Sequence, residues 1–188
     1  RSDTTDILIL VRIAVYETIL AFMTLIYFKR KDTDKFPDMR VFYMIIIAFI
    51  LPILASVYLA DLSTLIIVSL FFTAIVATYL GTYDGIILSV IETMMMWPLF
   101  NFDAEFIFVS VVGIVVTGCI AGKKNSNYNS ASLIVLPALA CIVSVVSYNA
   151  IFAATLRGYI ETGVWTGVSA ILSIILAIGV MPLVELAS

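Results

Sequence analysis

The sequence contains no histidine, and only 12% of its 188 residues are charged. Histidine is the commonest metal ligand and a frequent general base, so its absence removes much metal and acid–base chemistry. The sequence also lacks HExxH, GxSxG and Walker-type motifs. These absences predict a chain that is not itself an enzyme and that has no catalytic residue, no metal and no cofactor.

Basic residues and cysteines are also scarce. The net charge is −3, and no basic tract is interleaved with aromatic residues, so nucleic acid is not expected as a partner. The two cysteines, Cys119 and Cys141, lie in apolar runs without CxxC spacing. This placement favours buried small side chains over a disulfide.

Apolar residues are abundant: they make up 63% of the sequence, and the mean hydropathy is +1.16. A soluble domain is about 45–50% apolar and about 25% charged. The composition therefore predicts an integral membrane protein with the lipid bilayer as a partner. Lipid cannot satisfy unpaired backbone groups, and no run alternates as in a β-barrel, so the membrane spans are expected to be helices.

Seven apolar runs separated by short polar segments predict an all-α polytopic transmembrane bundle of about seven spans, forming one domain over residues 1–188. At a rise of 1.5 Å per residue, about 20 residues cross a hydrocarbon core of about 30 Å. The third, fourth and fifth runs are shorter, and the third and fourth could instead form a re-entrant hairpin around Gly81–Gly85. The expected spans are 7–28, 41–60, 63–80, 85–100, 106–121, 131–156 and 164–186.

The basic residues predict the orientation. If the N-terminus is outside, the outer segments hold only Arg1 and Arg157, and the inner segments hold the larger share. The positive-inside rule then places the N-terminus outside and the C-terminus in the cytoplasm. The inner basic residues are Lys29, Arg30, Lys31, Lys35, Arg40, Lys123 and Lys124.

Ionisable residues within spans cost about 2.5–3.5 kcal/mol each on insertion scales, so each requires an explanation. Glu17 and Glu92 are expected near the bilayer midplane, and Arg12 is shallow enough to reach the outer surface. One hypothesis is that Glu92, together with Glu17, lines a polar pocket or holds a proton that is bound or released as the protein changes its state. The alternative is structural: a hydrogen bond between helices to a serine, a threonine, Asn149 or Arg12.

The spacing GxxxG occurs three times and permits close helix approach, because glycine has no Cβ. Packing within the chain is the favoured interpretation, and a homodimer interface is the alternative. The residues are Gly81, Gly85, Gly118, Gly122, Gly163 and Gly167.

The sequence begins at Arg1 rather than at methionine and stops at Ser188, directly after an apolar run. We therefore expect it to be the membrane part of a longer protein.

The last apolar run, 167–185, reads GVSAILSIILAIGVMPLVE, with a Gly-x-x-Pro-x-x-Glu pattern at Gly179, Pro182 and Glu185. It resembles the end of the membrane region in the bacterial seven-transmembrane receptor HD-hydrolase family. Segments 100–106 and 118–124 are similar to linkers of that family, and Asn149 matches a position where the family tends to have asparagine.

The resemblance implies an extracellular domain before the spans and a cytoplasmic HD phosphodiesterase after them. In characterised relatives that enzyme hydrolyses cyclic di-AMP with a metal pair. The sequence contains none of the His-Asp ligands of an HD domain. Hydrolysis would therefore belong to a domain outside these residues.

The expected function is that of a receptor-like transmembrane signalling domain, multi-pass in the bacterial plasma membrane. Its partners would be its own extracellular and cytoplasmic domains, and Gly179, Pro182 and Glu185 would form the end that couples it to the enzyme.

Two other functions remain open from the sequence. One is a small transporter or substrate-binding subunit, with Glu17, Glu92 and Asn149 as its pocket. The other is a scaffold subunit of a cell-envelope complex.

Overall fold

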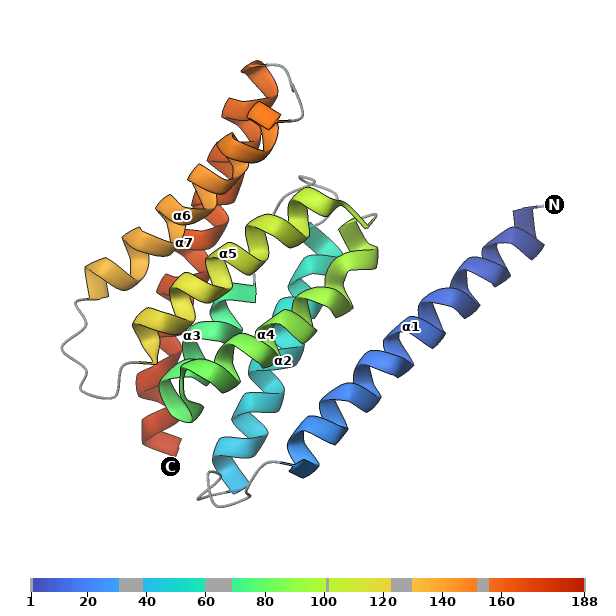
Figure 1. Cartoon of the computed structure of the whole chain (residues 1–188). Helices are drawn as coiled ribbons and strands as arrows, with labels where there is room; N and C mark the ends of the chain where they lie inside the picture. Colours follow the sequence, from blue (N-terminus) through green and yellow to red (C-terminus); the bar gives the residue numbers. More distant parts are fainter. Residues whose placement is uncertain are drawn as a thin grey trace. The chain divides into compact units, whose positions relative to one another are not determined.

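A computed structural model describes residues 2–30, 39–59, 69–100, 102–122, 130–151 and 156–187. Seven α-helices and one short 3-10 helix are found in these ranges, which contain no strand (Figure 1). The all-helical fold predicted from the sequence is therefore confirmed for the described residues. The helices are α1 (Ser2–Arg30), α2 (Met39–Leu59), α3 (Ser69–Leu80), α4 (Thr82–Met96), η2 (Trp97–Phe100), α5 (Ala104–Ala121), α6 (Ser130–Ile151) and α7 (Leu156–Ala187).

The chain divides into two compact units, Arg1–Lys35 and Phe36–Ser188. The helix of the first unit is α1, whose stretch Thr4–Tyr27 is long and apolar enough to cross a membrane. Large apolar side chains such as Leu10 and Phe22 are exposed on it. A helix that is apolar around its whole circumference is typical of a span that faces lipid or other helices.

Three helices of the second unit are also long and apolar enough to cross a membrane, over Ala104–Ala121, Ser132–Ile151 and Ile160–Val180. The apolar stretches of α2 and α3, Ile45–Tyr58 and Ser69–Leu80, are shorter. The molecule therefore has four candidate spans by length and composition within the described ranges.

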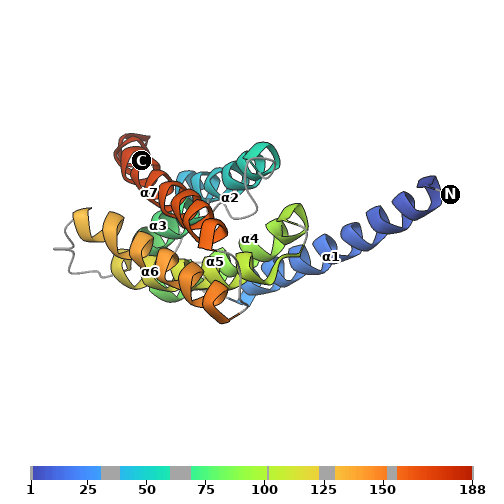
Figure 2. The same ribbon diagram turned by 90° about the horizontal axis from the view of Figure 1, so that it is seen from above.

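Helix α3 lies at the centre of the second unit. It packs against α2, α4, α5 and α7, and ten of its twelve residues are buried. Helices α6 and α7 run side by side, and α5 packs against α6 on one side and against α3 and α4 on the other (Figures 1 and 2).

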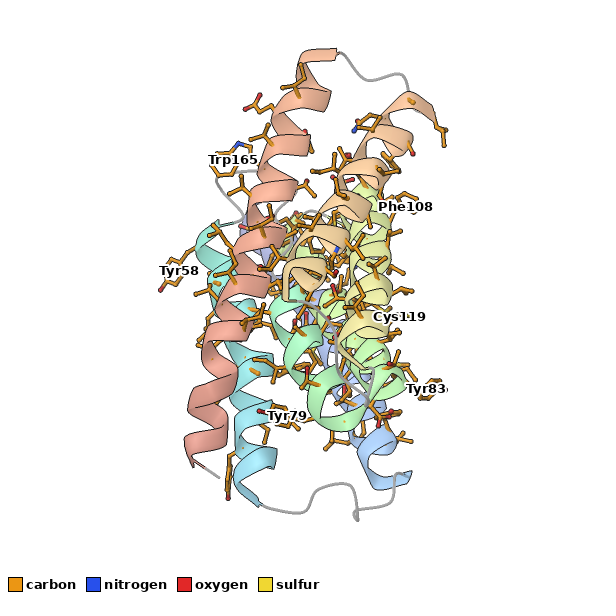
Figure 3. All side chains as sticks on the ribbon, turned by 90° about the vertical axis from the view of Figure 1, so that its left-hand side faces the viewer. Tyr58, Tyr79, Tyr83, Phe108, Cys119 and Trp165 are labelled. Carbon is orange, nitrogen blue, oxygen red and sulfur yellow. The ribbon has the colours of Figure 1, made fainter. Side chains whose placement is uncertain are left out.

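The second unit has an apolar core that includes Phe72, Leu88 and Phe106, and, unlike a water-soluble protein, it is apolar on its outside as well. Leu139, Val143 and Leu176 are at least half exposed, and Tyr58 and Trp165 point away from the bundle (Figure 3). Small hydroxyl side chains occupy other interior positions among the apolar ones, as is usual where small residues let membrane helices pack closely. Hydroxyl residues that are at most 1% exposed are Ser56, Ser69, Thr73, Ser89, Thr93, Ser110, Thr117 and Thr166.

Helices α3 and α4 form a hairpin joined by a single residue, Gly81. Its φ of 106° lies in the left-handed region that glycine adopts without strain. The helices then approach so closely that a Cβ on Gly85 would lie 2.8 Å from the Cβ of Ala77. The turn expected over five residues is therefore one residue long, and α4 begins at Thr82.

Helix α4 and η2 run beside α5 from one end to the other. At one end, a Cβ on Gly122 would clash with Thr82, and one on Gly118 would lie 2.7 Å from Ile86. At the other end, Trp97 of η2 hydrogen-bonds to Asp103, just before α5. Fifteen α-helical and four 3-10 residues extend about 22 Å and about 8 Å, together about the thickness of a hydrocarbon core.

Several edges of the expected spans lie outside the described residues, namely 60, 63–68 and 152–155. The crossing of the membrane by all seven helices stays a prediction, as does the orientation. All of the basic residues that predict the orientation also lie outside the described side chains.

Replacing Gly85 with alanine should destabilise the protein by about 1–3 kcal/mol, because the added Cβ overpacks the α3–α4 contact. Thermal unfolding of the chain in detergent micelles measures this effect. The matched control is Gly163→Ala, where a Cβ meets no atom within 4 Å. The control should unfold at the same or a slightly higher temperature, since alanine favours helix. Equal losses in both variants would contradict the packing role of Gly85.

Candidate functional site

The connection between α4 and α5 forms a corner from Trp97 to Phe106. The indole N–H of Trp97 donates to the carbonyl of Asp103 at 2.9 Å. Its ring packs edge-on against Phe102 with 5.2 Å between centroids, and Phe100 stacks on Phe106 at 4.1 Å. These contacts fix the end of η2 against the start of α5.

A side-chain hydrogen bond joins this corner to the end of α6. The Asn149 amide nitrogen donates to Glu105 Oε1 at 2.9 Å, and also to the carbonyl of Val145 at 2.8 Å. Asp103 caps α5, because its Oδ1 accepts from the backbone N–H of Glu105 at 3.1 Å. Asn149 and Glu105 are each half-buried. This pair therefore ties α6 to α5.

The sequence prediction included Asn149 but not its partner. Glu105 is 44 residues away in the chain. One signal could have found it: a carboxylate in the first turn of α5, two residues after the Asp103 cap.

Glu92 lies on α4 with 0% of its surface exposed. Neither carboxylate oxygen has a hydrogen-bond partner within the described part of the chain. One turn earlier, Ser89 Oγ accepts a hydrogen bond from Thr73 of α3 at 2.7 Å. One turn later, Met96 Sδ accepts one from Ser56 of α2 at 3.1 Å. Glu92 is thus an unpaired polar group between two hydroxyl contacts that join α4 to α3 and to α2.

The four residues of the predicted intramembrane polar site are distributed over both units. Arg12 and Glu17 lie on α1, where Arg12 is exposed and Glu17 is half-buried. In the second unit, Asn149 bonds to Glu105 rather than to Glu92. A shared site of Glu17, Arg12 and Glu92 stays a prediction.

The predicted coupling end lies on α7. Its backbone is helical to Ala187, and Gly179 is exposed, with no atom within 4 Å of where its Cβ would be. The side chains of Pro182 and Glu185 lie outside the described residues. Since α7 packs against α2, α3 and α6, a shift of those helices would reach this end.

The predicted packing glycines differ in their surroundings. Gly85, Gly118 and Gly122 lie at tight contacts among α3, α4 and α5, as described above. Gly167 of α7 faces α6, where its Cβ would lie 3.0 Å from Ile142 Cδ1. Gly81 forms the hairpin turn, and Gly163 has open space around it. A homodimer interface at any of these glycines stays a prediction.

An open groove of about 310 Å³ lies between α2, α3 and α7. Its one hydroxyl, on Ser173, already donates to the carbonyl of Ser169 at 2.7 Å. The groove therefore offers an apolar surface without a charged side chain. It is lined by Leu51, Pro52, Ala55, Phe71, Ser173, Leu176 and Val180.

No group of three or more histidine, cysteine, aspartate or glutamate side chains that could hold a metal ion is found among the residues that the structure describes. The described residues form a helix bundle with an apolar exterior. The corner between α4 and α5 is hydrogen-bonded to α6, and the carboxyl group of Glu92 is buried on α4. They define a multi-helix membrane domain.

The chain belongs to the family described as 7TM receptor with intracellular HD hydrolase, whose sequence model matches residues 7–188. The resemblance seen in the sequence is thereby confirmed. In this family the seven-transmembrane domain is the receptor part, and the HD hydrolase is a separate domain. No curated protein and no solved structure matches the chain.

Replacing Asn149 with alanine should destabilise the protein by about 1–3 kcal/mol, because the half-buried Glu105 loses its donor. The measurement is thermal unfolding, completed as a double-mutant cycle with Glu105→Ala. The cycle should return a coupling of about 0.5–3 kcal/mol. Ser147→Ala, an exposed position on the same helix, is the control. A coupling near zero would show that the hydrogen bond contributes nothing.

Proposed function

We propose that this chain is the receptor-like transmembrane signalling domain of a bacterial plasma-membrane protein, coupling an extracellular input to a cytoplasmic HD phosphodiesterase that hydrolyses cyclic di-AMP. The observation that carries this proposal is the family match over residues 7–188, whose description pairs a 7TM receptor with an intracellular HD hydrolase. In this proposal the chain transmits a signal, and the catalytic residues lie in the separate HD domain.

The contacts of the second unit supply a continuous route for such a signal. The corner is bonded to α6 through Asn149 and Glu105. Helix α6 packs along α7, where Ile142 faces Gly167. Helix α7 then continues to the proposed coupling end at Gly179, Pro182 and Glu185. A rigid helix that is held at one end by packing moves at its other end when that packing shifts.

The proposed orientation places the corner on the outer side and the end of α7 in the cytoplasm. Alkaline phosphatase fused after Ser188 should therefore be inactive, whereas green fluorescent protein fused there should fluoresce. The same reporters placed before Arg1 should give the opposite pattern. An active phosphatase after Ser188 would reverse the orientation and remove the proposed link to a cytoplasmic enzyme.

The coupling itself is tested on the complete protein in lipid nanodiscs, by its rate of cyclic di-AMP hydrolysis. Loosening the corner with Asn149→Ala should change this rate by roughly two- to thirty-fold, which corresponds to about 0.5–2 kcal/mol of coupling. Ser147→Ala should leave it unchanged. If the folded Asn149→Ala protein and every other folded variant of these helices kept the wild-type rate, the signalling proposal would be wrong.

A further inference from the structure

Four buried polar side chains without a hydrogen-bond partner in the described residues lie on α3, α4 and α5, three helices that pack against one another. They are Ser69, Glu92, Thr93 and Ser110, each at most 1% exposed. We call them the polar layer. These four side chains lie at nearly the same height along the axes of the three helices. This follows from the contacts that set the register of the helices.

The register of α3 and α4 is fixed at two points. Thr73 bonds to Ser89, and Ala77 touches Gly85. The two helices are antiparallel, so each step toward the start of α3 corresponds to one step toward the end of α4. One turn beyond the Thr73–Ser89 bond, Ser69 and the adjacent Leu70 therefore lie level with Glu92 and Thr93.

The register of α5 follows in the same way. Thr82 lies beside Gly122 and Ile86 beside Gly118. Continuing this antiparallel match brings Ser110 level with Met94, about 3 Å along the axis from Glu92. The side chain of Leu70 confirms the level, because its Cδ2 would lie 3.2 Å from a Cβ on Gly113, one turn from Ser110.

Among the side chains that the structure describes, the electrostatic surroundings of this layer contain no basic group. Helix α4 packs against α2, α3, α5 and η2, and the described side chains of these elements include no lysine or arginine. Their titratable groups lie away from the level of Glu92. They are Tyr43 and Tyr58 on α2, Tyr79 on α3, Tyr83 and Asp84 on α4 itself, and Glu105 and Cys119 on α5.

A charged carboxylate without a cation or a donor is far more costly to bury than a neutral acid. The neutral acid has one O–H to donate and oxygens that can still accept. The three hydroxyls at its level can each donate and accept, so a protonated Glu92 can be satisfied within the layer by rotation of side chains. A charged Glu92 would require a cation or water from outside it.

We propose that the polar layer is a proton-binding site, in which Glu92 is held as the neutral acid at neutral pH among Ser69, Thr93 and Ser110. Release of this proton places a charge at the centre of the α3–α4–α5 contact, and the charge is relieved only if water or a cation enters between these helices. The proton is thus a ligand that keeps the three helices together. This inference goes beyond the proposed function and does not rest on it, because its test needs no hydrolase.

The test is the infrared spectrum of the chain in lipid nanodiscs at neutral pH. The carbonyl stretching band of a protonated carboxylic acid should be present and should be lost in Glu92→Gln. The control is Glu161→Gln, whose side chain is exposed on α7 and whose substitution should leave the band intact. Absence of the band in the wild type, or its persistence in Glu92→Gln, would overturn the proposal.

A second measurement covers the case in which Glu92→Gln does not fold. Ser110→Ala removes a hydroxyl of the layer, so the wild-type band should shift in frequency, and an unshifted band would contradict the layer. Thermal unfolding in sodium chloride and in choline chloride at equal ionic strength should give the same temperature. A higher temperature in sodium chloride that disappears in Ser110→Ala would assign the layer to a sodium ion and overturn the proton site.

Discussion

The close approach of α3 to α4 and α5 is the contact on which the rest of the second unit depends. It occurs at Gly85 and Gly113, where a Cβ would meet Ala77 in one case and Cys141 and Leu70 in the other. Where the helices come this near, small side chains such as serine and threonine are buried beside large apolar ones such as Leu70 and Phe72. Other large apolar side chains lie on the outside, which suits lipid. Close helix contact and buried hydroxyl groups are thus two aspects of the same packing.

The position of the corner and the path to α7 both follow from this packing. Because α4 and η2 run the length of α5, the chain must reverse at Trp97–Phe106, and the aromatic stacking there makes the reversal rigid. Asn149 then attaches α6, and α6 attaches α7. The proposed output end is therefore linked to the corner by rigid helices rather than by a flexible loop.

Much of the fold follows from the sequence, because helices in hydrocarbon must satisfy their own backbone and because GxxxG marks close contacts. The hydrogen-bond partners of the polar residues do not follow from the sequence. Asn149 bonds to Glu105 across 44 residues, a pairing that depends on the relation of α5 to α6. The depth of Glu92 could be estimated by counting along its span. Its lack of a hydrogen-bond partner among the described residues depends on three helices at once. The single-residue turn at Gly81 likewise depends on the fit between Gly85 and Ala77.

The hairpin at Gly81 also bears on how the chain enters a membrane. A pair of antiparallel helices adds either two crossings or none, so the sides on which α2 and α5 end are the same whether the hairpin passes fully through the bilayer or stops within it. The basic residues of the other linkers can therefore set the sidedness of the whole chain without information from α3 and α4.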